Sequence, residues 1–415
     1  MNDLSWTPPG PPLPPSGPPP MPVAFSGNRK EFFHLIARGA GLELVTVGFY
    51  RFWLATDTRR HLWSNTLVDG DGAEYTGRGK ELLIGFLIAL AILVPVYLAY
   101  FLVGLEAERA KAFASLPLVA FFYVFGQFAI YRARRYRLTR TVWRGVRFWM
   151  SGSGWLYALQ AALWTLAVAI TLGLALPWRE AALERYKMRH SYYGDLQGSF
   201  AGRGSELFKR GWWLWLLIVG PLAIFIAIPV VKLLHGSPPL LTAAGVVAGI
   251  VSFLIPIAGP FLYGAFKAVE WRWWLSGIRF GEVRLESGLR KGALIGLYWK
   301  VIGWCVLLGI LFSGYIFLCA YLVAHMSGES MEVFFKSQTF AKSIPLLVLI
   351  GVGYLSYALS LNVVMRVYLL RDLWVRVLSS TIVHDIEAAA NVTARGELAN
   401  ALGEGFADGL DVAGF

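Results

Sequence analysis

Six long apolar stretches constrain this chain more than any other feature of its sequence. A helix needs about twenty apolar residues, at about 1.5 Å each, to cross the hydrocarbon layer of a membrane. The six stretches run near residues 82–104, 112–131, 212–231, 240–266, 297–323 and 344–365. Because 56% of the residues are hydrophobic and only 15% are charged, the chain is too apolar for a water-exposed surface. The sequence predicts an all-α membrane protein with six clear transmembrane helices.

The positions of lysine and arginine predict the topology, since such residues are retained on the cytoplasmic side. Residues 55–81, 132–154, 178–211, 267–298 and 366–378 hold four, seven, seven, six and three of them respectively. The turns at 105–111, 232–239 and 324–343 hold two, one and two. With the basic segments in the cytoplasm, the six helices form three hairpins, 82–131, 212–266 and 297–365. Both termini are then cytoplasmic.

Two further apolar stretches, 32–54 and 155–177, are harder to assign. The second lies between two basic segments, so a single crossing would place seven positive charges outside. We therefore expect a re-entrant or broken helical segment there and, by analogy, at 32–54. The alternative is that both stretches span, which gives eight full crossings.

The two ends have compositions typical of tails. Ten prolines between residues 8 and 22 predict a disordered proline-rich tail over 1–23, which is a spacer or a ligand for a protein partner. Six acids against one arginine after His384 predict a flexible acidic tail over 381–415. Between them we expect a first membrane repeat (24–148), a second (149–280) and a third hairpin (281–380).

When the chain is aligned with itself at a shift of 125 positions, nine residues between Thr46 and Leu82 are identical to their counterparts between Thr171 and Leu207. These identities indicate an internal duplication. A shorter phrase, aromatic-x-Gly-x-x-x-Glu, occurs three times, at Phe25, Tyr75 and Phe200. Glycine permits a tight turn, and the acid suits the start of a helix. We assign a structural role to the repeated residues Gly48, Trp53, Gly77, Glu81, Gly173, Pro177, Trp178, Gly202 and Glu206.

These phrases occur in a recognisable order. Val45-Thr46-Val47-Gly48 precedes Trp53, an Arg-Arg pair precedes Trp63-Ser64-Asn65-Thr66, and Tyr75-Thr76-Gly77-Arg78-Gly79 follows. The chain resembles the YjgN family of bacterial inner-membrane proteins, whose function is unknown, over roughly residues 24–380. One departure is Phe52, where the family pattern and the second repeat (Pro177) have proline. The resemblance implies a multi-pass inner-membrane protein but no reaction.

Five stretches rich in arginine and aromatic residues follow the predicted cytoplasmic helix ends. We call them the basic arms; they are residues 59–66, 140–148, 185–190, 272–280 and 371–376. They predict contact with anionic lipid headgroups, because arginine binds phosphate and tryptophan favours the headgroup level. The alternative is that they only set topology. The net charge of +12 is spread over short loops, which favours lipid over nucleic acid. The candidates are Arg59, Arg60, His61, Trp63, Asn65, Trp143, Arg144, Arg147, Arg185, Arg189, His190, Arg272, Arg279, Arg371 and Trp374.

The sequence predicts no catalytic residue, metal ion or cofactor, and does not indicate an oligomeric state. We expect a pore, a carrier or a lipid-contacting assembly. One alternative is a membrane enzyme for a lipid-linked substrate, which would use His61, Asn65, His190 and Asp195. Another is a scaffold that recruits partners through the proline-rich tail.

Overall fold

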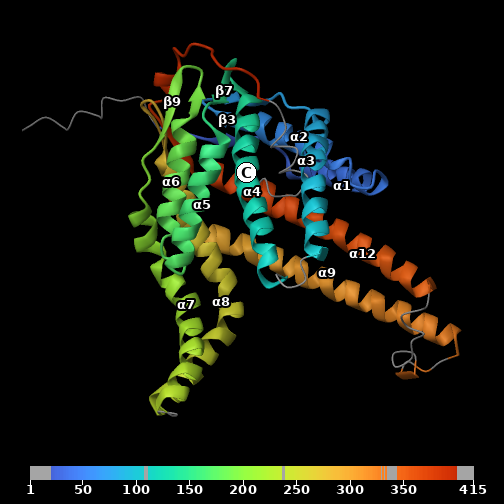
Figure 1. The fold of residues 1–415 in the computed structure, drawn as a ribbon. Helices are drawn as coiled ribbons and strands as arrows, with labels where there is room; N and C mark the ends of the chain where they lie inside the picture. The colour runs from blue at the N-terminus through green and yellow to red at the C-terminus, as the bar shows by residue number, and fades with distance from the viewer. Residues whose placement is uncertain are drawn as a thin grey trace, which may run out of the picture.

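A computed structural model of the chain describes residues 20–106, 111–235, 239–328, 330, 332–333 and 344–399. These residues are mostly helical. At one end of the molecule, however, the connectors between helices form β-strands (Figure 1). The prediction of an all-α fold is therefore wrong for the connectors, which were interpreted only as basic loops.

Within the described residues, nine strands form an antiparallel sheet in the order β1-β12-β11-β10-β9-β8-β7-β6-β5, and three more pair as β2-β3-β4. Their bounds are β1 (Met21–Pro22), β2 (Ala24–Phe25), β3 (Thr66–Val68), β4 (Asp71–Gly72), β5 (Glu74–Tyr75), β6 (Thr141–Trp143), β7 (Val146–Met150), β8 (Ser191–Tyr193), β9 (Leu196–Phe200), β10 (Ile278–Phe280), β11 (Val283–Ser287) and β12 (Thr381–His384).

The two sheets join at both of their edges. Val23 alone separates β1 from β2, and Ala73 alone separates β4 from β5, so the strands close into a ring. A closed ring leaves no open edge for another chain to pair with. Its strands share one buried cluster, made of Val23, Trp143, Tyr193, Val383 and Ile386.

Tight turns set the register of two hairpins in this ring. Asp69-Gly70 and Arg144-Gly145 have positive φ angles at both positions, of 53° and 79° and of 48° and 76°. Such two-residue turns match the twist of antiparallel strands. They join β3 to β4 and β6 to β7, with Val68 opposite Asp71 and Trp143 opposite Val146.

Helices leave the ring in pairs, and each pair starts and ends on strands that are hydrogen-bonded neighbours. The pairs are α1 (Arg29–Val45) with α2 (Arg51–Ser64), α3 (Gly79–Glu106) with α4 (Lys111–Thr139), α5 (Gly154–Ile170) with α6 (Leu176–Arg189), α7 (Gly204–His235) with α8 (Pro239–Gly277), and α9 (Lys291–Met326) with α12 (Ile344–Met365). The last continues as a π-helix, η2 (Arg366–Asp372), and α13 (Leu373–Leu378). All basic connectors thus gather at one end of the helices.

The stretches 32–54 and 155–177 are each broken by a turn, as we expected for the second and, by analogy, the first. Helices α5 and α6 begin and end 125 residues after α1 and α2. The breaks also correspond, because Val47-Gly48 and Leu172-Gly173 all have positive φ. At about 1.5 Å per residue, the 17 residues of α5 reach about 25 Å, less than a hydrocarbon layer of about 30 Å.

Four helical segments are long and apolar enough to cross a membrane: Gly79–Leu102, Gly204–Pro229, Lys291–Met326 and Leu346–Leu378. The pair Gly245–Leu254 and Ala258–Gly277, bent by 71° at a break, adds a fifth crossing if the two helices form one span rather than a re-entrant loop. The prediction of six clear spans is thus supported for four or five. The stretch 112–131 lies in α4, which does not qualify within the described residues.

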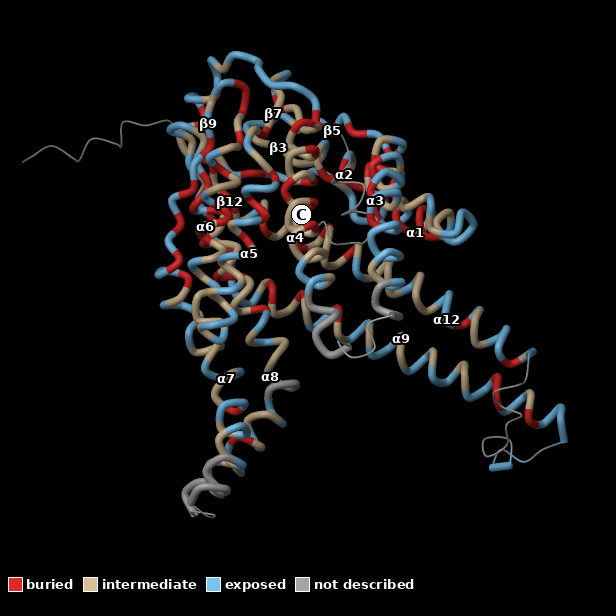
Figure 2. The backbone as a smooth tube through the Cα atoms, in the orientation of Figure 1, coloured by how far each residue is buried: buried red, intermediate tan, exposed pale blue. Residues whose placement is uncertain are grey.

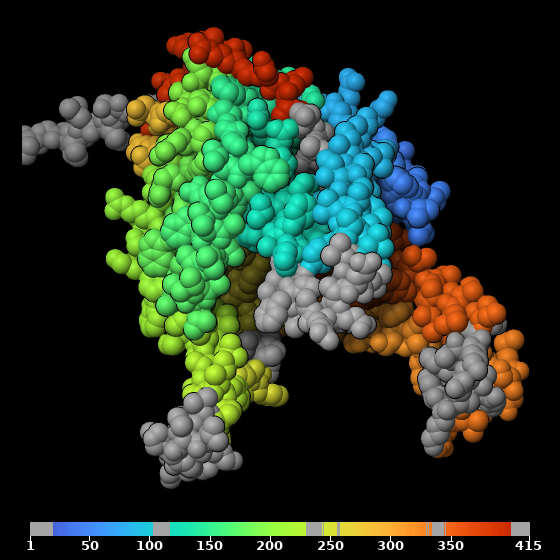
Figure 3. Space-filling model, viewed as in Figure 1, coloured from blue at the N-terminus to red at the C-terminus, as the bar shows by residue number. Residues whose placement is uncertain are grey.

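Burial is concentrated at the ring end of the molecule (Figure 2). In the four spans, between 6% and 22% of the most apolar window is buried. The pairs α7–α8 and α9–α12 diverge from the ring and expose apolar side chains along their lengths (Figures 1 and 3). Such surfaces require lipid or another apolar partner.

The two ends of the described chain belong to the ring rather than to tails. Met21 pairs with Val383 and Pro22 with Ile382. Beyond β12, the Thr393 amide donates to an Asp195 carboxylate oxygen at 3.1 Å. Residues 1–19 and 400–415 of the predicted tails lie outside the described part of the chain.

Two repeated glycines allow helices to pack backbone against backbone. A Cβ atom added to Gly204 would lie 2.7 Å from the Trp178 Cα and 2.8 Å from the Pro177 carbonyl oxygen. One added to Gly79 would lie 2.8 Å from the Trp53 Cα. Helix α7 thus starts against α6 as α3 starts against α2, which explains why glycine and tryptophan recur together.

We expect Gly204→Ala to lower the free energy of unfolding by about 1–3 kcal/mol, because backbone atoms must move to admit the methyl group. The matched control is Gly292→Ala in α9, where the new Cβ meets no atom within 4 Å. Alanine there should be neutral or stabilising. Thermal unfolding in detergent measures both; equal melting temperatures for the two variants would contradict the close approach.

Candidate functional site

The phrase that occurs three times forms a joint between a strand and the next helix. In each copy an arginine from another helix or π-helix donates to the carbonyl oxygen of the glycine. The bonds are Arg60 to Gly77 (2.8 Å), Arg185 to Gly202 (3.4 Å) and Arg371 to Gly27 (2.9 Å). The first two bonds each join a helical pair to the next pair along the chain. The third joins the last pair to the first, where the ring closes.

The remaining repeated residues also have local roles. Glu81 accepts from the Tyr136 hydroxyl and pairs with Arg140, both at 2.7 Å. Its counterpart Glu206 is exposed. Pro177 lies in the first turn of α6, where a proline costs no helical hydrogen bond. The assignment of structural roles to the motif residues stays a prediction.

Most basic-arm residues bind other parts of the protein. Trp63 stacks on Trp374 with ring centroids 5.0 Å apart, and each indole donates to a threonine hydroxyl. Arg144 pairs with Asp69 and Asp71, both at 2.6 Å. Further contacts tie in Arg59 (to the Tyr75 hydroxyl), Trp143 (to the Asp71 carbonyl) and Arg147 (to the Thr139 carbonyl). Arg272 is half-buried, whereas Arg189 and Arg279 are exposed.

The residues proposed for an enzyme do not converge on one site. His61 packs against Phe32, with ring centroids 5.4 Å apart, whereas the His190 ring lies 4.4 Å from Tyr186 in another helical pair. Burial lowers the pKa of His61, and Arg371 adds to this effect against the opposing charge of Glu31. Asn65 donates to the His61 carbonyl, and Asp195 accepts from Thr393. Within the described residues, no three His, Cys, Asp or Glu side chains form a metal site.

A buried ion cluster joins α4 to α6. Glu184 lies 2.8 Å from Arg134 and 2.6 Å from Lys187. Burial alone would raise the pKa of Glu184, but the two cations outweigh burial and hold this pKa at about 2. The cluster is enclosed by protein, so it stabilises the fold and offers no surface to a ligand.

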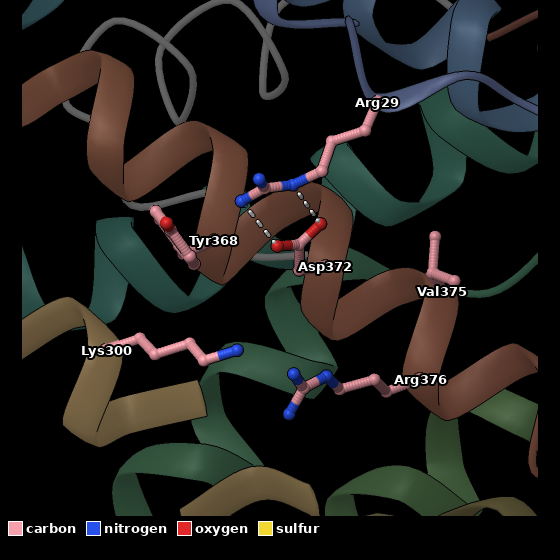
Figure 4. Close-up of a pocket in the computed structure, with 6 residues that line it drawn as sticks. All are labelled: Arg29, Lys300, Tyr368, Asp372, Val375 and Arg376. Carbon is pink, nitrogen blue, oxygen red and sulfur yellow. Dashed lines mark hydrogen bonds and ion pairs between the residues drawn. The ribbon is translucent and has the colours of Figure 1, made fainter. Parts of the chain in front are cut away.

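A cluster of cations faces an open cavity where the last helical pair meets the first. The cavity, here called the seam cavity, has a volume of about 530 Å³. Its walls are Arg29, Lys300, Tyr368, Asp372, Val375 and Arg376, from α1, α9, η2 and α13 (Figure 4). Arg29 binds Asp372 through two bonds, of 3.0 and 3.3 Å.

The π-helix η2 shapes this cavity. Its seven residues place Tyr368 and Asp372 on the cavity wall, and an ion pair of 3.1 Å joins Arg366 to Glu43 of α1. Segments of π-helix are rare and are frequent at functional sites. The sequence motifs did not reveal this site, because its parts are far apart in the chain; Arg29 and Asp372, which bind each other, are separated by 343 positions. The basic arm at 371–376 was the only signal for it.

A family model described as bacterial proteins of unknown function, DUF898, matches residues 20–409. The chain belongs to this family. The YjgN proteins belong to DUF898 too, so the predicted resemblance is confirmed. No curated protein and no solved structure matches the chain. With its apolar helices, this DUF898 chain is a multi-pass membrane protein of a bacterial family.

For this DUF898 protein we expect Glu184→Gln to destabilise the fold by about 3 kcal/mol at pH 7, because the folded pKa lies well below its ordinary value. A lowered carboxyl pKa stabilises the fold above the unfolded value of 4.5, and this contribution is lost as the pH falls towards 2. The difference in melting temperature from wild type should therefore hold from pH 7 to 5 and shrink below. Exposed Glu282→Gln is the control; a difference that is as large at pH 3 as at pH 7 would contradict the assignment.

Proposed function

We propose that this protein is a polytopic inner-membrane protein without enzymatic activity, which contacts anionic lipid at the cytoplasmic face. The observation that carries the proposal is that every helical pair returns to the strand beside the one it left. The basic connectors therefore share one side of the helices, as retention of lysine and arginine in the cytoplasm requires. Both ends of the described chain are on that side.

The two short pairs, α1–α2 and α5–α6, are proposed to enter the membrane without crossing it. Their tips expose apolar side chains: Val45 is 80% exposed, Val47 87%, Ile170 74% and Leu172 67%. Such tips are unfavourable in water but suit the boundary of the acyl chains. The breaks at membrane depth are short, and the threonine hydroxyls at 46 and 171 bind backbone groups on both sides.

We also propose that these two pairs descend from one duplicated unit. Their helix bounds and turn angles correspond at a spacing of 125 residues. The corresponding threonines each accept from the amide four residues ahead, Thr46 from Tyr50 and Thr171 from Ala175. Since lipid-facing side chains differ freely between the copies, the identities lie mainly at the joints.

Among a pore, a carrier and a lipid-contacting assembly, the geometry favours the last. The four spans bury at most 22% of their most apolar windows inside the protein. Helices that enclose a polar path would bury more of their surfaces against one another. Instead α7–α8 and α9–α12 diverge from each other (Figure 3), which leaves their apolar sides free for lipid.

The topology can be tested with single cysteines in a background without Cys305 and Cys319. We expect Ser199→Cys in β9 to react with a membrane-impermeant thiol reagent only from the cytoplasmic side, and Ser327→Cys at the end of α9 only from the periplasm. Ile170→Cys at the tip of α5 should react from neither side, because lipid covers it. Periplasmic labelling of Ile170→Cys would establish a full crossing instead.

The lipid preference can be tested in nanodiscs that contain equal amounts of phosphatidylglycerol and phosphatidylcholine. Lipids that stay bound in native mass spectrometry should be enriched in phosphatidylglycerol, and the enrichment should fall with ionic strength as screening increases. Equal retention of the two lipids at low salt would count against the lipid role.

A further inference from the structure

We propose that the seam cavity is a binding site for a phosphate group, carried by an anionic lipid or by a soluble phosphate ester. This inference rests on the proposed function where the ligand is a lipid. It assigns the interaction to Arg29, Lys300 and Arg376, none of which belongs to the repeated joints.

The charges that line the cavity are unbalanced. Three cations face one carboxylate, Asp372, which already binds Arg29 and also Arg371, the latter at 2.8 Å. Within the described residues, no carboxylate is paired with Lys300 or Arg376. Arg376 uses one guanidinium nitrogen to donate to the Ala293 carbonyl oxygen. The other N–H groups of its guanidinium can donate to a ligand.

The cationic groups point into one space. Figure 4 shows the Lys300 amine and the Arg376 guanidinium turned towards each other, beside the Arg29–Asp372 pair. Like charges held close together repel, and an anion between them removes that cost. Phosphate suits this arrangement because its several oxygens accept from planar guanidinium groups and from an amine at once. The volume of about 530 Å³ lies within the usual range of ligand sites.

The cavity lies in the part of the last helical pair that is nearer to the ring. Lys300 is in the third turn of α9, directly after the exposed Trp299, and further exposed apolar residues of this helix follow from Trp304 onwards. The Trp304 indole donates to the Tyr368 hydroxyl at 2.9 Å. Tryptophan and tyrosine with one polar end favour the interface between headgroups and acyl chains. A phosphate bound here would therefore be at the depth of lipid headgroups.

The test uses the full-length protein in neutral detergent, titrated with short-chain phosphatidylglycerol and followed by native mass spectrometry. We expect Lys300→Gln to raise the dissociation constant of the first bound lipid about tenfold, which corresponds to the loss of one charge-assisted bond. Lys300→Arg should retain binding. The matched control is Lys291→Gln, an exposed lysine on the same helix outside the cavity, which should change binding less than twofold.

A parallel titration with inorganic phosphate and with glycerol 3-phosphate identifies the source of the phosphate. If these compounds raise the melting temperature of the wild type but not of Lys300→Gln, the ligand is a soluble ester. If only the lipid titration depends on Lys300, the ligand is a lipid headgroup. If neither depends on Lys300, the proposal is overturned. The enrichment of phosphatidylglycerol in nanodiscs would survive that result, so the two failures are distinguishable.

Discussion

The strand that precedes each helical pair is hydrogen-bonded to the strand that follows it, and the rest of this structure depends on this constraint. Backbone groups of a strand need hydrogen-bond partners, and a soluble ring of strands cannot lie in hydrocarbon with polar side chains on its outer face. In the proposed topology the ring therefore lies in water. Each helical pair leaves the ring from one strand and comes back to the strand beside it.

This constraint explains the residues that recur along the chain. Where a helical pair leaves the ring, the chain changes sharply from strand to helix, and in three of the five pairs the joint is built from glycine, an aromatic residue and an arginine. At Gly77 and Gly202 an added Cβ atom would meet the ring of the aromatic residue two positions earlier at 2.6 Å. Arginine then satisfies the glycine carbonyl, a group that the change of direction leaves without a backbone partner. Recurrence here reflects construction of the fold rather than chemistry of a site.

The sequence predicted the apolar spans well because their signal extends over twenty or more residues. It also predicted the break in 155–177, since the charges on both sides argued against a crossing. The strands were missed because each has two to five residues, too few for a periodic pattern, and lies among arginines that indicate loops. The turn signals Asp69-Gly70 and Arg144-Gly145 were present in the sequence. The seam cavity could not be predicted, because only the closure of the ring brings Arg29 to Asp372.

The pairing of β1 with β12 has a consequence for biogenesis. Strands β5 to β11 can each find their partner as the next helical pair emerges from the ribosome, so most of the ring grows in chain order. The first strand has to wait until residue 384 has been synthesised. In every earlier intermediate the edge of β1 has no partner strand. The contact between the first and the last helical pairs is therefore completed last.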